Sequence, residues 1–227
     1  MIICKIAGVS KTYTLGKIKV HALSEITLDI CKGDFIAIAG PSGSGKTTLL
    51  NIIGALDTPN KGKVILDGID LTTAKHSELS KIRLYKIGFI FQSYNLIPVL
   101  NARENAEFVL FLQKKNKKYR QDKINALFSE VGISGLEDRF PYELSGGQQQ
   151  RVAIVRALAA TPSIILADEP TANLESSTAY RLLETMEKLN KKEQATFIFS
   201  THDPKIMGRA KKIIYLIDGK IDRIEEK

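Results

Sequence analysis

The sequence lacks the features that mark secreted, disulfide-bonded or membrane-spanning chains. Its two cysteines, Cys4 and Cys31, stand far apart without the spacing of a metal site, so we expect two reduced thiols without a functional role. The longest apolar stretches, such as 35–39 and 164–167, fall far short of the roughly 18 residues that a membrane-spanning helix needs. The first residues do not form a basic segment followed by an apolar stretch, which argues against an export signal. We therefore expect a cytoplasmic chain.

Repeats at solenoid spacing and low-complexity tracts are also missing, so the order of strands and helices must define the fold. With 227 residues, 44% hydrophobic and 26% charged, the chain is long enough for one compact unit with a substantial core. The net charge of +8 permits contact with nucleic acid or anionic lipid and does not choose between them. The densest basic cluster, 114–120, is predicted to be a solvated linker, and no specific nucleic acid is expected as a partner.

The order of apolar patterns indicates an α/β chain. Short alternating segments and the turns at 32–34 and 67–68 predict a largely antiparallel N-terminal region. Within it, 35–39 is a nearly continuous apolar run, typical of a strand buried on both faces. Further β-rich runs alternate with helical stretches, which predicts a parallel core; these runs are 87–91, 163–167, 196–199 and 212–217. Between 92 and 145 only helical patterns occur.

A glycine-rich loop follows the first buried run. Residues 40–47 match the phosphate-loop pattern G-x-x-x-x-G-K-[ST] between a predicted strand and a helix predicted over 47–55. Glycines let successive N–H groups turn toward one anion, the helix N-terminus adds positive partial charge, and Lys46 adds a full charge beside the β and γ phosphates. Thr47 offers a hydroxyl to Mg²⁺. The expected phosphate-binding residues are Gly40, Pro41, Ser42, Gly43, Ser44, Gly45, Lys46, Thr47 and Thr48.

Two adjacent carboxylates follow the apolar run 163–167. Successive strand side chains point to opposite sides, so Asp168 and Glu169 can serve different functions. We expect Asp168 to hold Mg²⁺ through water and Glu169 to polarise an attacking water. Taken alone, the pair could equally be an exposed acidic strand end; the phosphate loop favours the catalytic interpretation.

A second glycine motif, Leu144-Ser145-Gly146-Gly147-Gln148, precedes a helix predicted over 148–160 and indicates another anion-binding helix terminus. With Gln150 and Arg151 behind it, the motif resembles the signature of ATP-binding cassette (ABC) ATPases, and the resemblance covers nearly the whole chain. In that family the signature of one subunit closes over the ATP held by the other. The resemblance therefore implies a head-to-tail homodimer around two MgATP, with these signature residues supplied in trans: Ser145, Gly146, Gly147 and Gln148.

The resemblance implies roles for three more residues. Tyr13 is similar to the aromatic that stacks on adenine, although alone it could be an ordinary strand tyrosine. Gln92 resembles the glutamine that touches Mg²⁺ and the attacking water and senses the membrane partner. His202 resembles the switch histidine that contacts the γ-phosphate, whereas a lone histidine is more often structural. The expected catalytic residues are then Glu169, His202, Lys46 and Gln92, and the expected Mg²⁺ ligands are Thr47, Gln92 and Asp168.

The fold implied by the resemblance is α/β: a P-loop NTPase core of mainly parallel sheet, with an N-terminal antiparallel β region and an inserted helical subdomain. We predict a single ABC ATPase domain over 1–227, in which 1–92 and 146–227 form a RecA-like core and 93–145 the helical signature subdomain. One position departs from the family pattern, because Glu175 stands where a loop at the dimer contact usually ends in Asp. Its extra methylene is expected to shift the hydrogen bonds that link the two ATP sites.

Segments at 20–23, 40–54 and 91–98 look like those of the lipoprotein-release and macrolide-export type of ABC ATPase, whose members pair with membrane subunits. We therefore expect an ATP-hydrolysing subunit, peripheral at the cytoplasmic face of the cell membrane, that drives a separate integral membrane permease for lipoprotein, peptide or drug export or release. A regulator of cell-wall hydrolases acting through a membrane partner would have the same ATPase sequence. An ABC ATPase of DNA repair or translation is less favoured, because the chain has neither a long coiled coil nor a second cassette.

Overall fold

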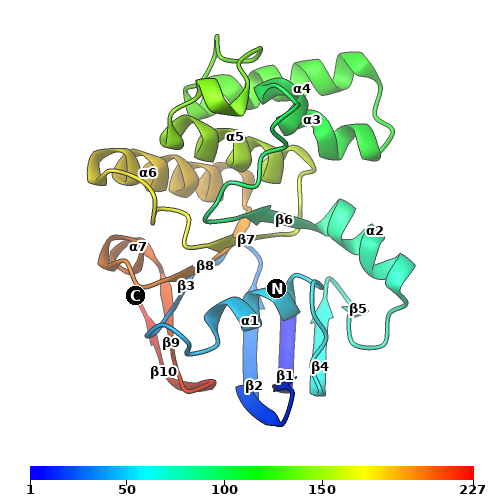
Figure 1. Ribbon diagram of the computed structural model, residues 1–227, viewed down its shortest axis with the longest axis vertical. Helices are drawn as coiled ribbons and strands as arrows, with labels where there is room; N and C mark the ends of the chain where they lie inside the picture. The colour runs from blue at the N-terminus through cyan, green and yellow to red at the C-terminus, as the bar shows by residue number, and fades with distance from the viewer.

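A six-stranded sheet forms the centre of the molecule (Figure 1). The computed structural model describes residues 1–227, except the side chains of Leu15 and Glu193. The strand order is β10-β9-β3-β8-β7-β6; every neighbouring pair is parallel except β9 and β10. The strands are β3 (Phe35–Ala39), β6 (Ile87–Ile90), β7 (Ile164–Asp168), β8 (Thr196–Thr201), β9 (Lys212–Ile217) and β10 (Lys220–Glu226). The predicted mainly parallel core is confirmed.

A smaller antiparallel sheet covers one side of this core. Its strand order is β2-β1-β4-β5, which confirms the predicted antiparallel region. The helix α1 (Lys46–Ile53) lies between the two sheets, and α2 (His76–Lys86) leads directly into β6 (Figure 1). The four strands are β1 (Ile2–Leu15), β2 (Ile18–Cys31), β4 (Lys61–Leu66) and β5 (Ile69–Asp70).

The other face of the six-stranded sheet is covered by helices (Figure 1). They are α3 (Ala102–Leu112), α4 (Lys117–Val131), α5 (Gly146–Ala159), α6 (Ser176–Glu193) and the short α7 (Pro204–Arg209), with a 3₁₀ turn at Pro141–Glu143. The helical character predicted between 92 and 145 is confirmed, whereas the subdomain boundaries stay a prediction. Among the described helices, none combines the length and apolar character that crossing a bilayer requires.

The central strand β3 divides the core into two layers. All five of its residues are buried, and alternate side chains point to opposite faces. On one face, Phe35, Ala37 and Ala39 pack among the residues of α3 to α6. On the other face, Ile36 and Ile38 pack among those of α1 and the smaller sheet. Each fully buried Ile or Phe side chain stabilises the fold by about 1.5–3 kcal/mol. Burial on both faces therefore fixes the strand from which the phosphate loop emerges.

Two helices differ from their predicted bounds. α1 begins at Lys46 and ends at Ile53 rather than spanning 47–55, because Gly54 caps it and Ala55 adopts a left-handed backbone with φ 55°. α5 begins at Gly146, two residues earlier than expected, because the Ser145 side chain caps it. Both signature glycines therefore lie in the first turn of α5.

The basic cluster 114–120 is only partly a linker. Asn116 caps α4 by accepting a hydrogen bond from the Tyr119 N–H at 2.9 Å, so Lys117 and the residues after it belong to the helix. Arg120 pairs with Glu107 at 3.1 Å. The prediction was wrong for the second half of the cluster because an asparagine N-cap starts a helix there.

β6 and α5 approach each other closely at Gly88. A Cβ at this position would lie 2.6 Å from the Ala157 carbonyl oxygen, well inside van der Waals contact. The strand that leads to Gln92 therefore packs directly on the helix that begins after Ser145.

Candidate functional site

The candidate residues follow the carboxyl ends of four neighbouring parallel strands. Gly40 follows β3, His202 follows β8, Asp168 ends β7 and Gln92 lies two residues beyond β6. The strand order β3-β8-β7-β6 brings all of these ends to one edge of the sheet. Ligands of open α/β sheets bind at this edge. Residues spread over more than half of the chain are thus gathered by strand pairing.

The phosphate loop wraps around the ammonium group of Lys46. This side chain is 6% exposed, and its Nζ donates hydrogen bonds to the carbonyl oxygens of Gly40 and Pro41 at 2.8 and 2.9 Å. Two glycines permit the tight path: a Cβ on Gly40 would lie 2.1 Å from the Leu216 carbonyl oxygen, and Gly45 has φ 99° with the Ala22 carbonyl oxygen 2.4 Å from its Cβ position. The first N–H groups of α1 have no acceptor within the helix, so they can bind an anion.

Hard oxygen ligands adjoin the loop. The Thr47 hydroxyl donates to both carboxylate oxygens of Asp168, at 3.1 and 3.3 Å, and such oxygens suit Mg²⁺. The Ser44 Oγ is buried in the loop and has no hydrogen-bond partner among the described residues. No group of three or more His, Cys, Asp or Glu side chains gathers within the described part of the chain. A magnesium ion would therefore be held by Thr47 and Asp168 together with substrate phosphates and water, as is usual for this ion.

Glu169 and His202 form a pair across β7 and β8. The His202 Nδ1 lies 2.9 Å from the Glu169 Oε1, and the Glu169 N–H donates to the Ser200 carbonyl oxygen at 3.0 Å. Glu169 has φ 44°, a left-handed backbone that is uncommon for residues other than glycine and often marks functional sites. The contact leaves the Nε2 of His202 directed away from the carboxylate and available to a second group.

Gln92 is tied to the loop that follows β7. The Asn173 side-chain amide donates to the Gln92 carbonyl oxygen at 3.0 Å. Two residues on, Tyr94 has φ 61°, and its hydroxyl lies 2.7 Å from the Cβ position of Gly146. The Arg156 guanidinium, whose pKa is lowered by burial, donates to the Tyr94 carbonyl oxygen at 2.7 Å. The segment after Gln92 is thus fixed to α5, the helix that carries the signature.

Tyr13 lies beside the N-terminal part of α1. Its hydroxyl donates to Asp57 at 2.7 Å, and its pKa is raised by partial burial and by that hydrogen bond, against an opposing contact with Thr48. Burial opposes the ionisation of Asp57, but hydrogen bonds from Lys11 and Tyr13 hold the pKa of this carboxyl below its ordinary value. The ring is 36% exposed. An exposed aromatic ring near the phosphate loop is suitable for stacking on a base.

The signature residues form the N-terminus of α5. The Ser145 N–H donates to Gln148 Oε1 at 2.8 Å, and the Gln148 N–H donates to Ser145 Oγ at 3.4 Å, which makes a capping box. α5 covers the helical face of the six-stranded sheet, whereas α1 lies on the opposite face (Figure 1). Among the described residues, no hydrogen bond joins the signature to the phosphate loop. The chain therefore has two separate helix N-termini, each with free N–H groups that could bind an anion.

Two residues that position the site were not singled out from the sequence. Asn173 holds Gln92, and Arg156 holds the segment after it. Each contact spans at least 20 residues of sequence, so no local pattern indicates it. The sequence indicates only that backbone carbonyl groups in the loops after the strands need hydrogen-bond donors. It does not identify the residues that donate to them.

Glu175, the position that departs from the family pattern, lies at the N-cap of α6. Its side chain makes no capping hydrogen bond, although the shorter Asp is among the strongest N-cap residues. The Glu175 carbonyl oxygen still accepts the first intrahelical bond, from the Ala179 N–H at 2.9 Å. The extra methylene thus leaves the carboxylate exposed rather than bonded to its own helix.

Comparisons with known proteins place these features in a family context. The family model described as "ABC transporter" matches residues 23–172. An uncharacterized ABC transporter ATP-binding protein of Methanocaldococcus jannaschii, MJ0796, is 45% identical over 98% of this chain and 96% of its own length. A macrolide export ATP-binding/permease protein, MacB, of Syntrophobacter fumaroxidans is 42% identical over 98% of this chain, which spans 31% of that larger protein.

The same similarity holds in three dimensions. A dimeric structure of the ATP-binding cassette MJ0796, in a post-hydrolysis state bound to ADP and Pi, superposes with a TM-score of 0.92 and 43% identity, covering 98% of each chain. The similarity is therefore one of sequence as well as of fold.

Proposed function

This chain belongs to the ABC transporter family and is an ATPase that uses ATP with Mg²⁺; from that premise we propose how its two motifs cooperate. Two copies associate head to tail around two ATP molecules. The phosphate loop of one copy and the signature of the other contact each nucleotide. Hydrolysis reopens the pair, and the movement drives a separate membrane subunit.

One observation carries the proposal of a shared site. α1 and α5 lie on opposite faces of the six-stranded sheet (Figure 1), so Lys46 and Ser145 of one chain do not face a common ligand. Each helix N-terminus favours an anion, and a second copy turned head to tail supplies the missing half to each site. The dimeric structure of the MJ0796 cassette with ADP and Pi supports this arrangement.

The side chains at the strand ends have distinct roles in the proposed reaction. The Lys46 ammonium binds the β and γ phosphates, and the signature of the partner copy contacts the same γ-phosphate through Ser145 and the N–H groups behind it. The Glu169 carboxylate accepts the proton of the attacking water, while His202 holds that carboxylate and presents Nε2 to the γ-phosphate. Bound to Thr47, Asp168 and Gln92, Mg²⁺ would neutralise the charge that develops on the phosphates.

An apolar surface beside Gln92 supports docking of a membrane subunit. Phe89 and Phe91 stack with ring centroids 5.6 Å apart and line a hollow of about 230 Å³ between β6, α3 and α5. Apolar side chains of the loop after Gln92 and of α3 are also exposed, namely Val99 at 79% and Phe111 at 60%. Apolar surface of this kind marks interaction sites. MacB, of which this chain matches one part, is named an ATP-binding/permease protein, so we infer that a separate permease occupies this surface.

Site-specific photo-crosslinking tests the docking surface. A benzophenone side chain at Val99 should crosslink to an integral membrane protein in intact cells, because this exposed residue lies in the loop that runs from Gln92 to α3. The matched control is Ile224 on β10, which is also exposed, at 42%, but lies at the opposite edge of the sheet. Mass spectrometry of the crosslinked band identifies the partner. Equal crosslinking from both positions, or none from Val99, would show that the permease does not dock here.

A further inference from the structure

A second cavity lies at the opposite edge of the sheet from the nucleotide site. It encloses about 280 Å³ between the N-terminal strands and helices α4, α5 and α6. Ser163 and Ala195 in its wall directly precede β7 and β8, whereas the catalytic candidates follow the carboxyl ends of these strands. The cavity is therefore separate from the ATP site.

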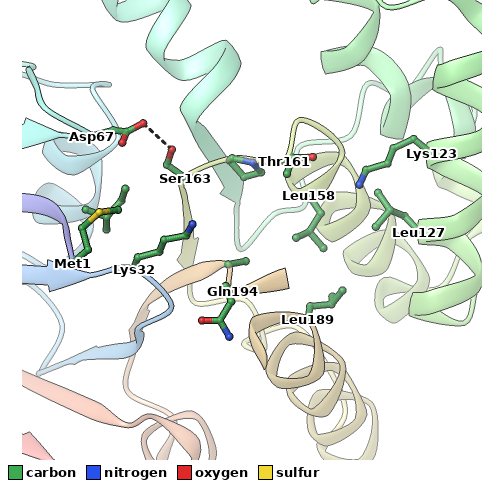
Figure 2. Close-up of a pocket in the computed structure, with 13 residues that line it drawn as sticks. Met1, Lys32, Asp67, Lys123, Leu127, Leu158, Thr161, Ser163, Leu189 and Gln194 are labelled. Atoms are coloured by element: carbon green, nitrogen blue, oxygen red, sulfur yellow. Dashed lines mark hydrogen bonds between the residues drawn. The ribbon is translucent and has the colours of Figure 1, made fainter. Parts of the chain in front are cut away.

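The cavity combines an apolar wall with two ammonium groups. Figure 2 shows Leu127, Leu158 and Leu189 on one side, with the Lys32 and Lys123 side chains extending from opposite sides toward the same space. Lys32 comes from the turn after β2, and Lys123 comes from α4. Among the described residues, neither ammonium has a carboxylate within ion-pair distance. Lys32 is exposed and Lys123 is half-buried, and the convergence of their positive charges over apolar side chains favours an anion between them.

The one carboxylate in the wall does not fill this role. Asp67 forms an ion pair with Lys86 and accepts a hydrogen bond from the Ser163 hydroxyl at 3.3 Å, drawn as a dashed line in Figure 2. Lys86, Ser163 and, to the smallest extent, Lys32 lower the pKa of Asp67, so its charge is present and compensated mainly by Lys86. The C-terminal ends of α5 and α6 also point toward the cavity and carry partial negative charge, roughly half an elementary charge each. Against two lysines, the remaining excess is about one positive charge.

We propose that this cavity binds a monocarboxylate with an alkyl chain of medium length, its carboxylate between Lys32 and Lys123 and its chain against the leucines. The single excess positive charge matches one carboxylate. The volume is equivalent to about nine water molecules and lies near the lower limit of small-molecule pockets, roughly 300 Å³, which suits a short amphipathic molecule. Small-molecule sites typically have a mainly apolar wall and a small number of polar groups that orient the ligand.

Calorimetric titration of the full chain with sodium octanoate tests the proposal. Octanoate should bind saturably, and octan-1-ol, which has the chain without the charge, should bind about tenfold or more weakly, because a tenfold change corresponds to the loss of one modest charge contact. The double variant Lys32→Met/Lys123→Met should weaken octanoate binding by about tenfold or more for the same reason. Butanoate should also bind more weakly, because it leaves most of the leucine wall uncovered.

A matched double variant separates site binding from a change in overall charge. Lys17→Met/Lys118→Met also removes one lysine from a turn and one from α4, both exposed and both outside the cavity, so its octanoate affinity should equal that of the parent chain. Both double variants should keep the thermal unfolding midpoint and the ATP affinity, which shows that they are folded. Absence of saturable octanoate binding, or equal affinity in the two double variants, would overturn the proposal.

Discussion

Replacing Glu169 by glutamine is expected to abolish most ATP hydrolysis while leaving ATP binding intact. The amide has the shape of the carboxylate and can keep the contact with His202 Nδ1, which is 2.9 Å long in the parent chain. It cannot accept the proton of the attacking water. Loss of a general base typically lowers a rate by about 10²–10⁴-fold, or roughly 3–5 kcal/mol in the activation barrier. Steady-state phosphate release and nucleotide binding, measured on the same preparation, check the two halves of this expectation.

The same variant should accumulate as an ATP-bound dimer, since hydrolysis is the step that reopens the pair. Light scattering with and without MgATP measures the mass. Asp122→Asn, which neutralises an exposed carboxylate on α4, is the matched control and should hydrolyse ATP at the parent rate. A Glu169→Gln chain that turns over normally would remove Glu169 from the catalytic role proposed for it.

Replacing Ser145 by arginine should prevent ATP-dependent dimerisation and abolish hydrolysis without weakening ATP binding to the single chain. Arginine is bulky, places positive charge at the N-terminus of α5, and removes the capping box with Gln148, whose loss costs about 1 kcal/mol of stability. Because α1 lies on the other face of the sheet, the phosphate loop of the same chain is unaffected. Nucleotide affinity and mass, measured with MgATP, check the two expectations.

Ser145→Ala separates the loss of the cap from the steric and electrostatic effect of arginine. It should share the small loss of stability, which urea unfolding measures, but should still dimerise with ATP. If the Ser145→Arg chain dimerised as the parent chain does, Ser145 would not lie at the contact between copies.

The sequence predicted those parts of the fold and site that depend on local patterns. The apolar run of β3, the glycine spacing before Lys46 and the carboxylates after β7 each occupy a few consecutive residues, and the structure places them at one edge of the sheet. No spacing of residues in the sequence predicts the contact between Glu169 and His202. It follows from the pairing of β7 with β8. The alternation of strands and helices predicts a parallel sheet, but it does not predict which strands are neighbours.

Contacts between distant segments lay beyond sequence reasoning for a physical reason. Asn173 bonds to Gln92 and Asp57 to Tyr13 because folding brings segments that are distant in sequence into contact. Many other polar residues have similar sequence neighbours and make no such contact. The start of α4 was missed for a different reason. Asn116 caps that helix, a local signal that was outweighed by the run of lysines around it.

The cavity with Lys32 and Lys123 illustrates the same limit. Its wall combines a turn, the ends of two helices and the residues before two strands, and none of these segments resembles a ligand motif alone. Only the three-dimensional arrangement shows two ammonium groups converging over leucines (Figure 2).

The central claim is that the phosphate loop of one copy faces the signature of another, and thiol crosslinking between copies tests it most directly. Cys31, which is exposed, would be replaced by serine, while the buried Cys4, whose pKa is raised to about 12 mainly by burial, can remain because it is unreactive. One chain carries Ser42→Cys and the other Ser145→Cys, both with Glu169→Gln to hold the dimer.

With MgATP and a short bifunctional thiol reagent, the mixture of the two chains should yield a covalent dimer, and each chain alone should not. A mixture that gives no covalent dimer, or a chain carrying both cysteines that crosslinks only within itself, would contradict a site shared between copies.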